Sequence, residues 1–254
     1  MGCVISGSIV TYNNMKSIKK TLETLFEHTK DSNFKLYVVD NGSTDGTPEF
    51  IEKEYPQVEL IRTGKNIGFG AGHNVVIEKI QSDYHAIINP DLVFPENTIG
   101  KMAEFMENNR DVGLVSPKIC FPDGRNQILG KKNPCLKYLV ASRLRKGDEP
   151  GKLLSEYAML EKGTSEPFDI ENASGCLMLV RTVVLKQING FDERYFMYFE
   201  DADLTRKVNE ISRTVYYPSA VVNHVWGRDS KRNVKLMAIH FQSMLKYFAK
   251  WKTL

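Results

Sequence analysis

Short apolar runs alternate with segments of helical periodicity through the first 116 residues, and this alternation constrains the fold more than any other feature. The apolar runs predict buried strands at residues 4–10, 34–40, 58–62, 84–89 and 112–115. Helices are expected between them, the first with Ile18, Leu22 and Leu25 on one face and the last over residues 96–109. Strands separated by helices of this length indicate an α/β fold with a parallel, doubly wound sheet.

Local start signals place two of these helices. Thr47 is expected to cap the second helix, with Pro48 at its first position and Glu49 in its first turn. Another helix is expected to begin in the glycine-rich segment 68–72, where glycines allow the backbone to approach an anion closely. These glycines do not match the GxGxxG spacing and do not follow the first predicted strand, which argues against a dinucleotide-binding dehydrogenase.

Polar side chains follow the predicted strands where each one ends. Thr11, Asp40, Asn66 and Asp91 all lie just beyond an apolar run. Because the carboxyl ends of parallel strands share one edge of a sheet, we expect these residues to converge there. Ligands of open α/β sheets bind at that edge, so it is the expected functional site.

The second half of the sequence is less regular. Residues 131–151 form a basic segment flanked by Pro and Gly, expected to be a loop or a helical excursion. Beyond it, we expect strands at 173–180 and 214–217 and helices at 181–188, 200–210 and 233–252. With no repeat and no linker, residues 1–254 are expected to form one domain.

Composition excludes several functional classes. The charge excess is small, with 34 Lys and Arg against 31 Asp and Glu, and does not predict nucleic-acid binding. The four cysteines include no CxxC pair, which argues against a zinc ribbon or a thioredoxin-like site and fits a reducing compartment. No apolar run approaches the roughly 18–20 residues of a membrane span, and no secretion signal is visible, so a cytoplasmic location is expected.

Two aspartates at strand ends are candidate ligand-binding residues. Asp40 opens a turn-rich segment, 40–46, and could contact the polar edge of a ring, although taken alone an Asx-type turn is the simpler explanation. Asp91 follows Pro90 and could hold Mg²⁺ or Mn²⁺ on a diphosphate, because these ions prefer oxygen ligands. An ordinary turn aspartate is the alternative.

Three carboxylates gather at the start of the helix predicted over 200–210. Glu200, Asp201 and Asp203 could supply a general base, because like charges raise carboxylate pKa values while a helix N-terminus lowers them. Charge complementarity in a solvated first turn is the alternative. We expect Glu200 and Asp203 to bind neighbours such as Arg194 or Arg206, leaving Asp201 free.

A late histidine completes the candidates. His224 could be a metal ligand, and Arg228 with Ser230 could bind phosphate. A single histidine is more often a structural residue, so this reading depends on the others.

Taken together and in order, seven segments resemble the family 2 inverting glycosyltransferases of the GT-A type, in their bacterial rhamnosyltransferase-like branch. They are residues 8–14, 38–47, 65–74, 88–92, 173–181, 190–208 and 223–230. The resemblance implies a Rossmann-like sheet, mostly parallel and flanked by helices. It also implies a nucleotide-sugar-binding half, 1–116, and an acceptor-binding and catalytic half, 117–230, followed by a terminal amphipathic helix, 231–254.

The resemblance also implies roles for individual residues. It makes Asp201 the general base, supported by Glu200, and makes Asp91 and His224 the ligands of Mn²⁺ or Mg²⁺. The residues implied to bind the donor are Thr11, Tyr12, Asp40, Asn66, Gly70, Asn74, Asn89, Arg228 and Ser230. Asn89 stands where the family has the first acidic residue of its metal-binding motif.

The activity implied is metal-dependent transfer of a sugar, with rhamnose from dTDP-rhamnose as the best candidate, from a nucleotide diphosphate. The acceptor would be a growing cell-surface polysaccharide or a lipid-linked glycan. Two other classes remain open at this point. A sugar-phosphate nucleotidyltransferase could share the sheet and the metal-binding aspartate, and an inactive nucleotide-sugar-binding module could share the whole pattern.

The C-terminal segment 231–254 predicts an amphipathic helix with six Lys and Arg and no acidic residue. Its apolar stripe holds Val234, Met237, Ala238, Phe241, Met244, Leu245 and Phe248. Packing on the core, with a basic face that includes Lys250 turned to solvent, is the simpler expectation. Docking at the inner face of an anionic membrane is the alternative, and off-stripe Leu236 and Ile239 hint at a dimer partner.

Overall fold

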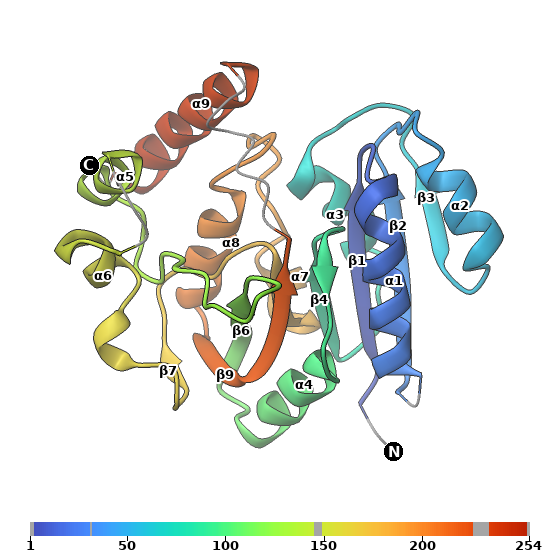
Figure 1. Ribbon diagram of the computed structural model, residues 1–254, viewed down its shortest axis with the longest axis horizontal. Helices are drawn as coiled ribbons and strands as arrows, with labels where there is room; N and C mark the ends of the chain where they lie inside the picture. Colours follow the sequence, from blue (N-terminus) through green and yellow to red (C-terminus); the bar gives the residue numbers. More distant parts are fainter. Residues whose placement is uncertain (1–2, 31, 145–148, 226–233, 253–254) are drawn as a thin grey trace.

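The computed structural model describes residues 3–30, 32–144, 149–225 and 234–252 (Figure 1). Its strands are β1 (Ile5–Thr11), β2 (Phe34–Asp40), β3 (Glu59–Arg62), β4 (Tyr84–Ile88), β5 (Leu92–Val93), β6 (Val112–Cys120), β7 (Phe168–Asp169), β8 (Leu177–Arg181) and β9 (Arg213–His224). Its helices are α1 (Met15–Thr29), α2 (Thr47–Glu54), α3 (Phe69–Ile77), α4 (Thr98–Asn108), α5 (Leu136–Leu144), α6 (Lys152–Tyr157), the short 3₁₀ helix η1 (Leu160–Lys162), α7 (Thr182–Gln187), α8 (Glu200–Asn209) and α9 (Val234–Trp251).

The described strands form one mixed sheet in the order β3-β2-β1-β4-β8-β6-β9-β5, with β7 alongside β9. The pairings β1–β2, β1–β4, β2–β3 and β6–β9 are parallel, whereas β8, β5 and β7 run antiparallel to their neighbours. Six strands therefore point one way, which places the carboxyl ends of β1, β2, β4, β6 and β9 on one edge. The predicted mostly parallel α/β sheet is confirmed, and its central antiparallel strand β8 was not foreseen.

Helices cover both faces of the sheet. Buried side chains of α1, α2 and α4 pack with one face, and those of α3, α7 and α8 pack with the other. Ile18, Leu22 and Leu25 are buried on α1, as its periodicity predicts. The two apolar layers thus enclose the sheet on both faces and leave the carboxyl ends of its parallel strands at an edge.

Local signals misplaced the start of α2. Gly46, in a left-handed conformation, is the N-cap, and Thr47 is the first helical residue. Asp45 supplies the capping chemistry instead, because its Oδ1 accepts bonds from the amide of Thr47 at 3.1 Å and from its hydroxyl at 2.6 Å. Pro48 is near the start as expected, since its missing amide hydrogen costs nothing there.

The C-terminal helix α9 packs on a third apolar cluster, formed by Tyr195, Phe199, Ala202, Tyr247 and Phe248. The predicted stripe is split, because Phe248 is buried whereas Val234, Met237, Phe241 and Leu245 are exposed. Lys250 does not face solvent as expected, since it forms ion pairs with Asp192 and Asp203. Within the part of the chain that the structure describes, no helix is both long and apolar enough to cross a membrane.

Candidate active site

The strand ends bring the predicted polar residues to one edge, as the topology requires. Thr11 and Asp40 end β1 and β2, Asn89 and Asp91 follow β4, and His224 ends β9. The start of α8, with Asp201, reaches the same edge because Gly175, just before β8, donates its amide to that carboxylate. Residues far apart in the sequence thus surround one region.

The pairing of β5 with β9 brings Asp91 beside His224. Leu92 lies opposite His224 in this antiparallel pair, and the amide of Val225 donates to the carbonyl of Asp91. Helix α1 holds the other side of the loop, since the Thr21 hydroxyl donates to the Pro90 carbonyl at 2.9 Å. As a result, His224 Nε2 lies 3.4 Å from Asp91 Oδ2.

Hydrogen bonds from Gln127 define the tautomer of His224. The Gln127 amide nitrogen donates to the carbonyls of Cys120 and His224, so its Oε1 is the atom that accepts from His224 Nδ1, at 3.1 Å. With the proton on Nδ1, the lone pair of a neutral ring at Nε2 points toward the Asp91 carboxylate. Two lone pairs facing each other need a cation or a proton between them.

A divalent cation fits this pair. Asp91 Oδ1 is buried without a hydrogen-bond partner among the described residues, and a carboxylate oxygen with an imidazole nitrogen suits Mn²⁺ or Mg²⁺. No third His, Cys, Asp or Glu of the described chain joins them. Such a cation would therefore take its remaining ligands from water and from a bound diphosphate.

Asp40 combines a turn with a place at the site. Its Oδ2 accepts from the amides of Gly42 and Ser43 at 3.1 and 3.0 Å, which is the Asx-type turn considered above. Among the described residues, its Oδ1 accepts from the Thr11 hydroxyl alone, at 3.2 Å, and so keeps one accepting position. Tyr12, next in the chain, is half exposed.

The glycine-rich segment is used for packing. Gly68 has φ +98°, and a Cβ there would lie 2.5 Å from the Phe196 carbonyl oxygen, so only glycine fits. A Cβ on Gly70 would lie 2.8 Å from the Cβ of Phe191. The donor-binding role implied for Gly70 stays a prediction, beside this structural reason for a glycine.

Two asparagines of this segment are tied to neighbouring backbone. Asn66 Oδ1 accepts from the amide of Gly68 at 3.0 Å. Asn74 donates to the Phe191 carbonyl and accepts from the Phe191 amide, both at 2.9 Å, and also donates to Glu193. The Asn74 bonds connect the glycine-rich segment to the segment that leads into α8.

Asp201 is partly buried and held by two backbone amides. Its Oδ2 accepts from Gly175 at 3.0 Å and its Oδ1 accepts from Ala202 at 2.8 Å. Burial raises the pKa of Asp201 above its ordinary value, against the opposing effect of these two bonds. Each oxygen keeps one accepting position, as a general base requires.

The other two carboxylates behave differently. Glu200 is buried, and burial together with the neighbouring Asp201 charge raises its pKa well above the ordinary value. Asp203 is fully buried and pairs with Lys250 at 2.7 Å and with the Trp251 indole at 2.8 Å.

The expected arginine partners were wrong for both residues. Arg194 pairs with Asp192, and Arg206 stacks on the ring of Trp251 with 4.5 Å from its guanidinium carbon to the ring centroid. Helix α9 supplies the cation for Asp203 instead. The position of α9 depends on tertiary packing, so the sequence around Asp203 does not predict this ion pair.

The backbone entering α8 is strained. Tyr198 and Phe199 have φ of 70° and 66°, in the left-handed region that aromatic residues rarely adopt. Packing of Phe199 against Tyr247 and Phe248 stabilises this conformation. Strained residues beside a buried carboxylate pair are typical of functional sites.

Three contributors were missed by the sequence analysis. Gln127 fixes His224, and Gly175 fixes Asp201. The Tyr157 phenol lies close enough to Asp201 that the charge of Asp201, together with burial, raises the pKa of Tyr157. The Asp123-Gly124 turn, which returns the chain along β6, was the available signal for Gln127. Arg228 and Ser230 lie outside the described residues.

Comparison with known families places the chain among sugar-transferring enzymes. The family model described as "Glycosyl transferase family 2" matches residues 8–188. This stretch includes Asp40 and Asp91 and ends before Asp201 and His224. The resemblance drawn from the sequence is confirmed.

Two curated relatives match nearly the whole chain. The N-acetylglucosaminyl-diphospho-decaprenol L-rhamnosyltransferase of Mycobacterium tuberculosis (strain CDC 1551 / Oshkosh) is 28% identical, over 94% of this chain and 82% of the relative. Rhamnosyltransferase WbbL of Escherichia coli (strain K12) is 25% identical, over 97% of this chain and 93% of the relative.

Solved structures share the fold. Mannosyltransferase PcManGT from Pyrobaculum calidifontis, in complex with GDP-Man and Mn²⁺, has a TM-score of 0.69 at 18% identity and covers 98% of this chain. This chain spans 64% of that one. S. aureus TarS 1-349 in complex with UDP-GlcNAc has a TM-score of 0.65 at 18% identity, over 95% of this chain and 66% of that one. The predicted GT-A type fold is confirmed.

Proposed function

The chain belongs to glycosyltransferase family 2, and we propose that it moves rhamnose from dTDP-rhamnose to a glycan hydroxyl with inversion of configuration. The acceptor would be a lipid-linked glycan or a growing cell-surface polysaccharide. The observation that carries this proposal is that Asp201 and the Asp91–His224 pair lie at the same edge of the sheet. The two relatives named as rhamnosyltransferases support the choice of sugar.

Asp201 is proposed to accept the proton of the attacking hydroxyl. Its raised pKa makes it a stronger base than an exposed aspartate, and the two amides hold both oxygens in fixed positions. As the proton moves to Asp201, the hydroxyl oxygen bonds to the anomeric carbon and the bond to the nucleoside diphosphate breaks. A single displacement of this kind inverts configuration and needs no nucleophilic carboxylate.

Glu200, in its protonated and uncharged form, is proposed to support Asp201. Its raised pKa favours protonation, which keeps a second negative charge away from the base. Its Oε2 has no hydrogen-bond partner among the described side chains and main chain, so this atom is available to form a hydrogen bond with the acceptor sugar.

Asp91 and His224 are proposed to hold Mn²⁺ or Mg²⁺ together with the donor diphosphate. When bound, the cation would neutralise charge on the departing nucleoside diphosphate. Gln127 keeps the proton of His224 on Nδ1, so that Nε2 is free to bind it.

The donor half is proposed to bind the nucleotide. Asp40, with Thr11 and Tyr12, would contact the base, and the free accepting position on Asp40 Oδ1 supports this. The remaining donor-binding proposals are Asn66, Gly70, Asn74, Asn89, Arg228 and Ser230, in a half spanning residues 1–116. Residues 117–230 would bind the acceptor.

Two exposed apolar stripes support contact with an anionic membrane, where lipid-linked acceptors reside. Val234, Met237, Phe241 and Leu245 of α9 are 40–76% exposed, and Leu136, Val140 and Leu144 of α5 are 46–72% exposed. The Arg143 side chain of α5 contacts the Met237 sulfur of α9, so the stripes are neighbours (Figure 1). Lys250 pairs with Asp192 and Asp203, and the other five Lys and Arg within 231–254 add positive charge that complements anionic lipid. The proposal therefore places the reaction at the cytoplasmic face of a membrane.

Sedimentation with vesicles of anionic and of neutral lipid tests this contact. The double variant Phe241→Ser, Leu245→Ser is expected to lose binding to anionic vesicles. Val183→Ser, which removes an apolar side chain of similar exposure on α7, is the control. Equal sedimentation of the two variants would contradict membrane docking, and a changed oligomeric state without loss of vesicle binding would point to a second copy.

Transfer from dTDP-rhamnose with Mn²⁺, followed by product analysis, tests the function itself. We expect dTDP-rhamnose to stabilise the protein against heat more than UDP- or GDP-sugars do, and dTDP to be the released product. Release of pyrophosphate would identify a nucleotidyltransferase instead. Donor binding without transfer or hydrolysis would identify an inactive binding module.

A further inference from the structure

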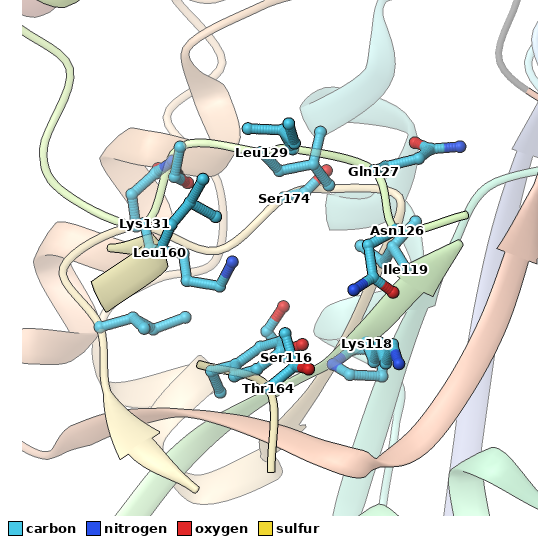
Figure 2. A pocket seen from close by; sticks show the side chains of 16 residues that line it. Ser116, Lys118, Ile119, Asn126, Gln127, Leu129, Lys131, Leu160, Thr164 and Ser174 are labelled. Atoms are coloured by element: carbon cyan, nitrogen blue, oxygen red, sulfur yellow. Dashed lines mark hydrogen bonds between the residues drawn. The ribbon is translucent and has the colours of Figure 1, made fainter. Parts of the chain in front are cut away.

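A small pocket lies between β6 and the segments around it (Figure 2). Its volume is about 50 Å³, and its walls come from 116–119, from the return segment 126–131, from Leu160 and Thr164, and from the approach to β8. The site residues described above do not fill it. A space of this size exceeds the roughly 30 Å³ share of one water, so it can hold a small polar group.

The pocket is electropositive. Its titratable lining residues are Lys118, Lys131 and Tyr216, and no carboxylate is among the described residues that line it. Figure 2 shows the side chain of Lys131 reaching into the open space. A partly buried ammonium without a carboxylate partner favours binding of an anion.

Lys131 is held where it can receive such a ligand. Its Nζ lies 4.6 Å from the centroid of the Tyr216 ring and 3.5 Å from the Ala158 carbonyl oxygen, which is a weak contact. Burial lowers its pKa to about 8. The ammonium form therefore dominates at neutral pH and has unused donors.

Asn172 adds a second requirement. It is 9% exposed, its Nδ2 donates to the Gly130 carbonyl at 2.9 Å, and its Oδ1 has no partner in the described part of the chain. An unpaired buried acceptor needs a donor from the ligand. A phosphate ester of a sugar supplies both an anion for Lys131 and a hydroxyl or amide donor for Asn172.

The pocket adjoins the reacting groups on both sides. Asn172 and Ser174 lead directly to Gly175, whose amide holds Asp201. Gln127, on the opposite wall, holds His224. A ligand anchored here is thus beside the base in the acceptor half.

We propose that this pocket binds the phosphate group of a sugar-phosphate acceptor and so presents a hydroxyl of that sugar to Asp201. The proposal rests on the proposed function and narrows it, because an acceptor without an anionic group is then a poor substrate. Lys131 is the main anion ligand, Lys118 contributes at the pocket wall, and Asn172 pairs with a donor on the sugar.

Titration calorimetry without donor tests the pocket separately from the reaction. The probes are N-acetylglucosamine 1-phosphate, neutral N-acetylglucosamine and galacturonate. We expect the sugar phosphate to bind most tightly, and Lys131→Met to weaken its binding about tenfold to a hundredfold, as for loss of a charged hydrogen bond. Lys131→Arg should restore much of the affinity, which separates loss of charge from loss of folding.

Lys132→Met is the matched control. Lys132 is next in the chain and lies 3.6 Å from Glu156 instead of lining the pocket. We expect it to leave sugar-phosphate binding unchanged. Equal binding of neutral sugar and sugar phosphate, tighter binding of galacturonate, or equal loss in both lysine variants would overturn the proposal.

Binding of dTDP with Mn²⁺ separates this proposal from the proposed function. We expect Lys131→Met to leave dTDP affinity unchanged, and an equal loss of dTDP affinity would assign the pocket to the donor diphosphate. Absence of rhamnosyl transfer with intact Lys131-dependent phosphate binding would refute the donor assignment alone.

The pH dependence gives an independent check. Tyr216, with its pKa raised to about 12, does not titrate near neutrality, and no lining carboxylate does. Affinity for the sugar phosphate should therefore fall as pH rises through about 8, where Lys131 loses its proton. The fall should be absent in Lys131→Arg, and a fall of equal size there would contradict the role of Lys131.

Discussion

The two halves of the molecule satisfy their polar groups in different ways. In the donor half, Asp40 and Asp45 are bonded to nearby amides and hydroxyls within their own loops. In the acceptor half, Glu200 Oε2 and Asn172 Oδ1 are buried without partners in the described structure. Natural proteins keep such features mainly where a ligand completes them. The described part of the donor half has two such atoms, His73 Nε2 and Asp91 Oδ1. The comparison therefore indicates that the Asp40–Asp45 loop is preformed, whereas the region around Asp91 and the acceptor half need their ligands.

The halves also differ in how buried titratable groups respond to pH. In the donor half, burial lowers the pKa of His85 to about 3 and that of His73 well below its ordinary value. Their contribution to stability is present above pH ~6.5 and is lost as pH falls. In the acceptor half, the raised pKa of Glu200 has the opposite consequence.

Replacing the base should give the largest effect and should be confined to the acceptor half. We expect Asp201→Asn to lower single-turnover transfer by about 10²–10⁴-fold while donor affinity stays near native, because only the proton-accepting charge is lost. Donor calorimetry beside transfer kinetics makes the measurement. Near-native transfer in this variant, with collapse in Glu200→Gln, would assign the base to Glu200.

Breaking the buried ion pair of α8 and α9 should be the largest effect on stability. Lys250→Met leaves fully buried Asp203 without its cation, which costs about 3–5 kcal/mol in such pairs. Arg62→Met in the donor half removes two exposed pairs, to Glu49 and Glu52, and should cost about 1 kcal/mol or less. Urea unfolding measures how much unfolding free energy each variant loses, and equal losses would contradict this difference between the halves.

The difference between the two halves also explains how much of each could be predicted from the sequence. In the first half, β1 and β2 lie within one residue of their predicted bounds and α1 buries its predicted face, because apolar periodicity decides local structure there. The meeting of Asp91 with His224 depends on two-residue β5 pairing with the end of β9, which periodicity cannot reveal. The strand predicted at 214–217 in fact continues to His224 past a register shift against β6, so its extent was underestimated.

The contacts within the site were harder to predict from the sequence than the residues that gather there, and the catalytic roles of those residues stay predictions. Asp201 was singled out from three neighbouring carboxylates, and it is the one held by Gly175 and left with free accepting positions. The partners of Asp203 come from α9, 47 and 48 residues away, and were unpredictable from local sequence.

Glutamine at position 200 should reveal the pH contrast. Because the folded pKa of Glu200 is raised, its contribution to stability is fully present below the unfolded pKa and is lost as pH rises toward the folded pKa. Above pH ~4.3, the unfolding free energy of Glu200→Gln should therefore rise relative to that of the native protein, by up to about 1.4 kcal/mol per pH unit. Urea unfolding from pH 4 to 8 measures this, with exposed Glu210→Gln of the same helix as control. A pH-independent difference would mean that Glu200 is ionised in the folded state.

Removing the partner of His224 should weaken cation binding more mildly. Gln127→Leu frees the His224 ring to change tautomer and orientation, which should reduce Mn²⁺ affinity in the presence of dTDP about 10–100-fold. Calorimetry gives the affinity, and exposed Gln187→Leu is the control. Unchanged affinity would mean that His224 is not a ligand, and would leave Asp91 as the main metal-binding residue.

The smallest expected effect lies in the preformed loop that contains Asp40 and concerns the base of the nucleotide. Asp40 Oδ1 has one accepting position left, which suits the N3–H donor of thymine or uracil. Cytosine lacks that donor and leaves the position unfilled. dTDP and UDP should therefore compete better than CDP in the native protein. Asp40→Asn replaces a charged acceptor with a neutral one, a difference of about 1 kcal/mol, and should narrow this preference about fivefold. Asp45→Asn, five residues further along the same loop, changes the charge equally without reaching the base and should leave the preference intact. Equal competition by all three nucleotides in the native protein would show that Asp40 serves only its turn, and the preformed loop would then have a structural role alone.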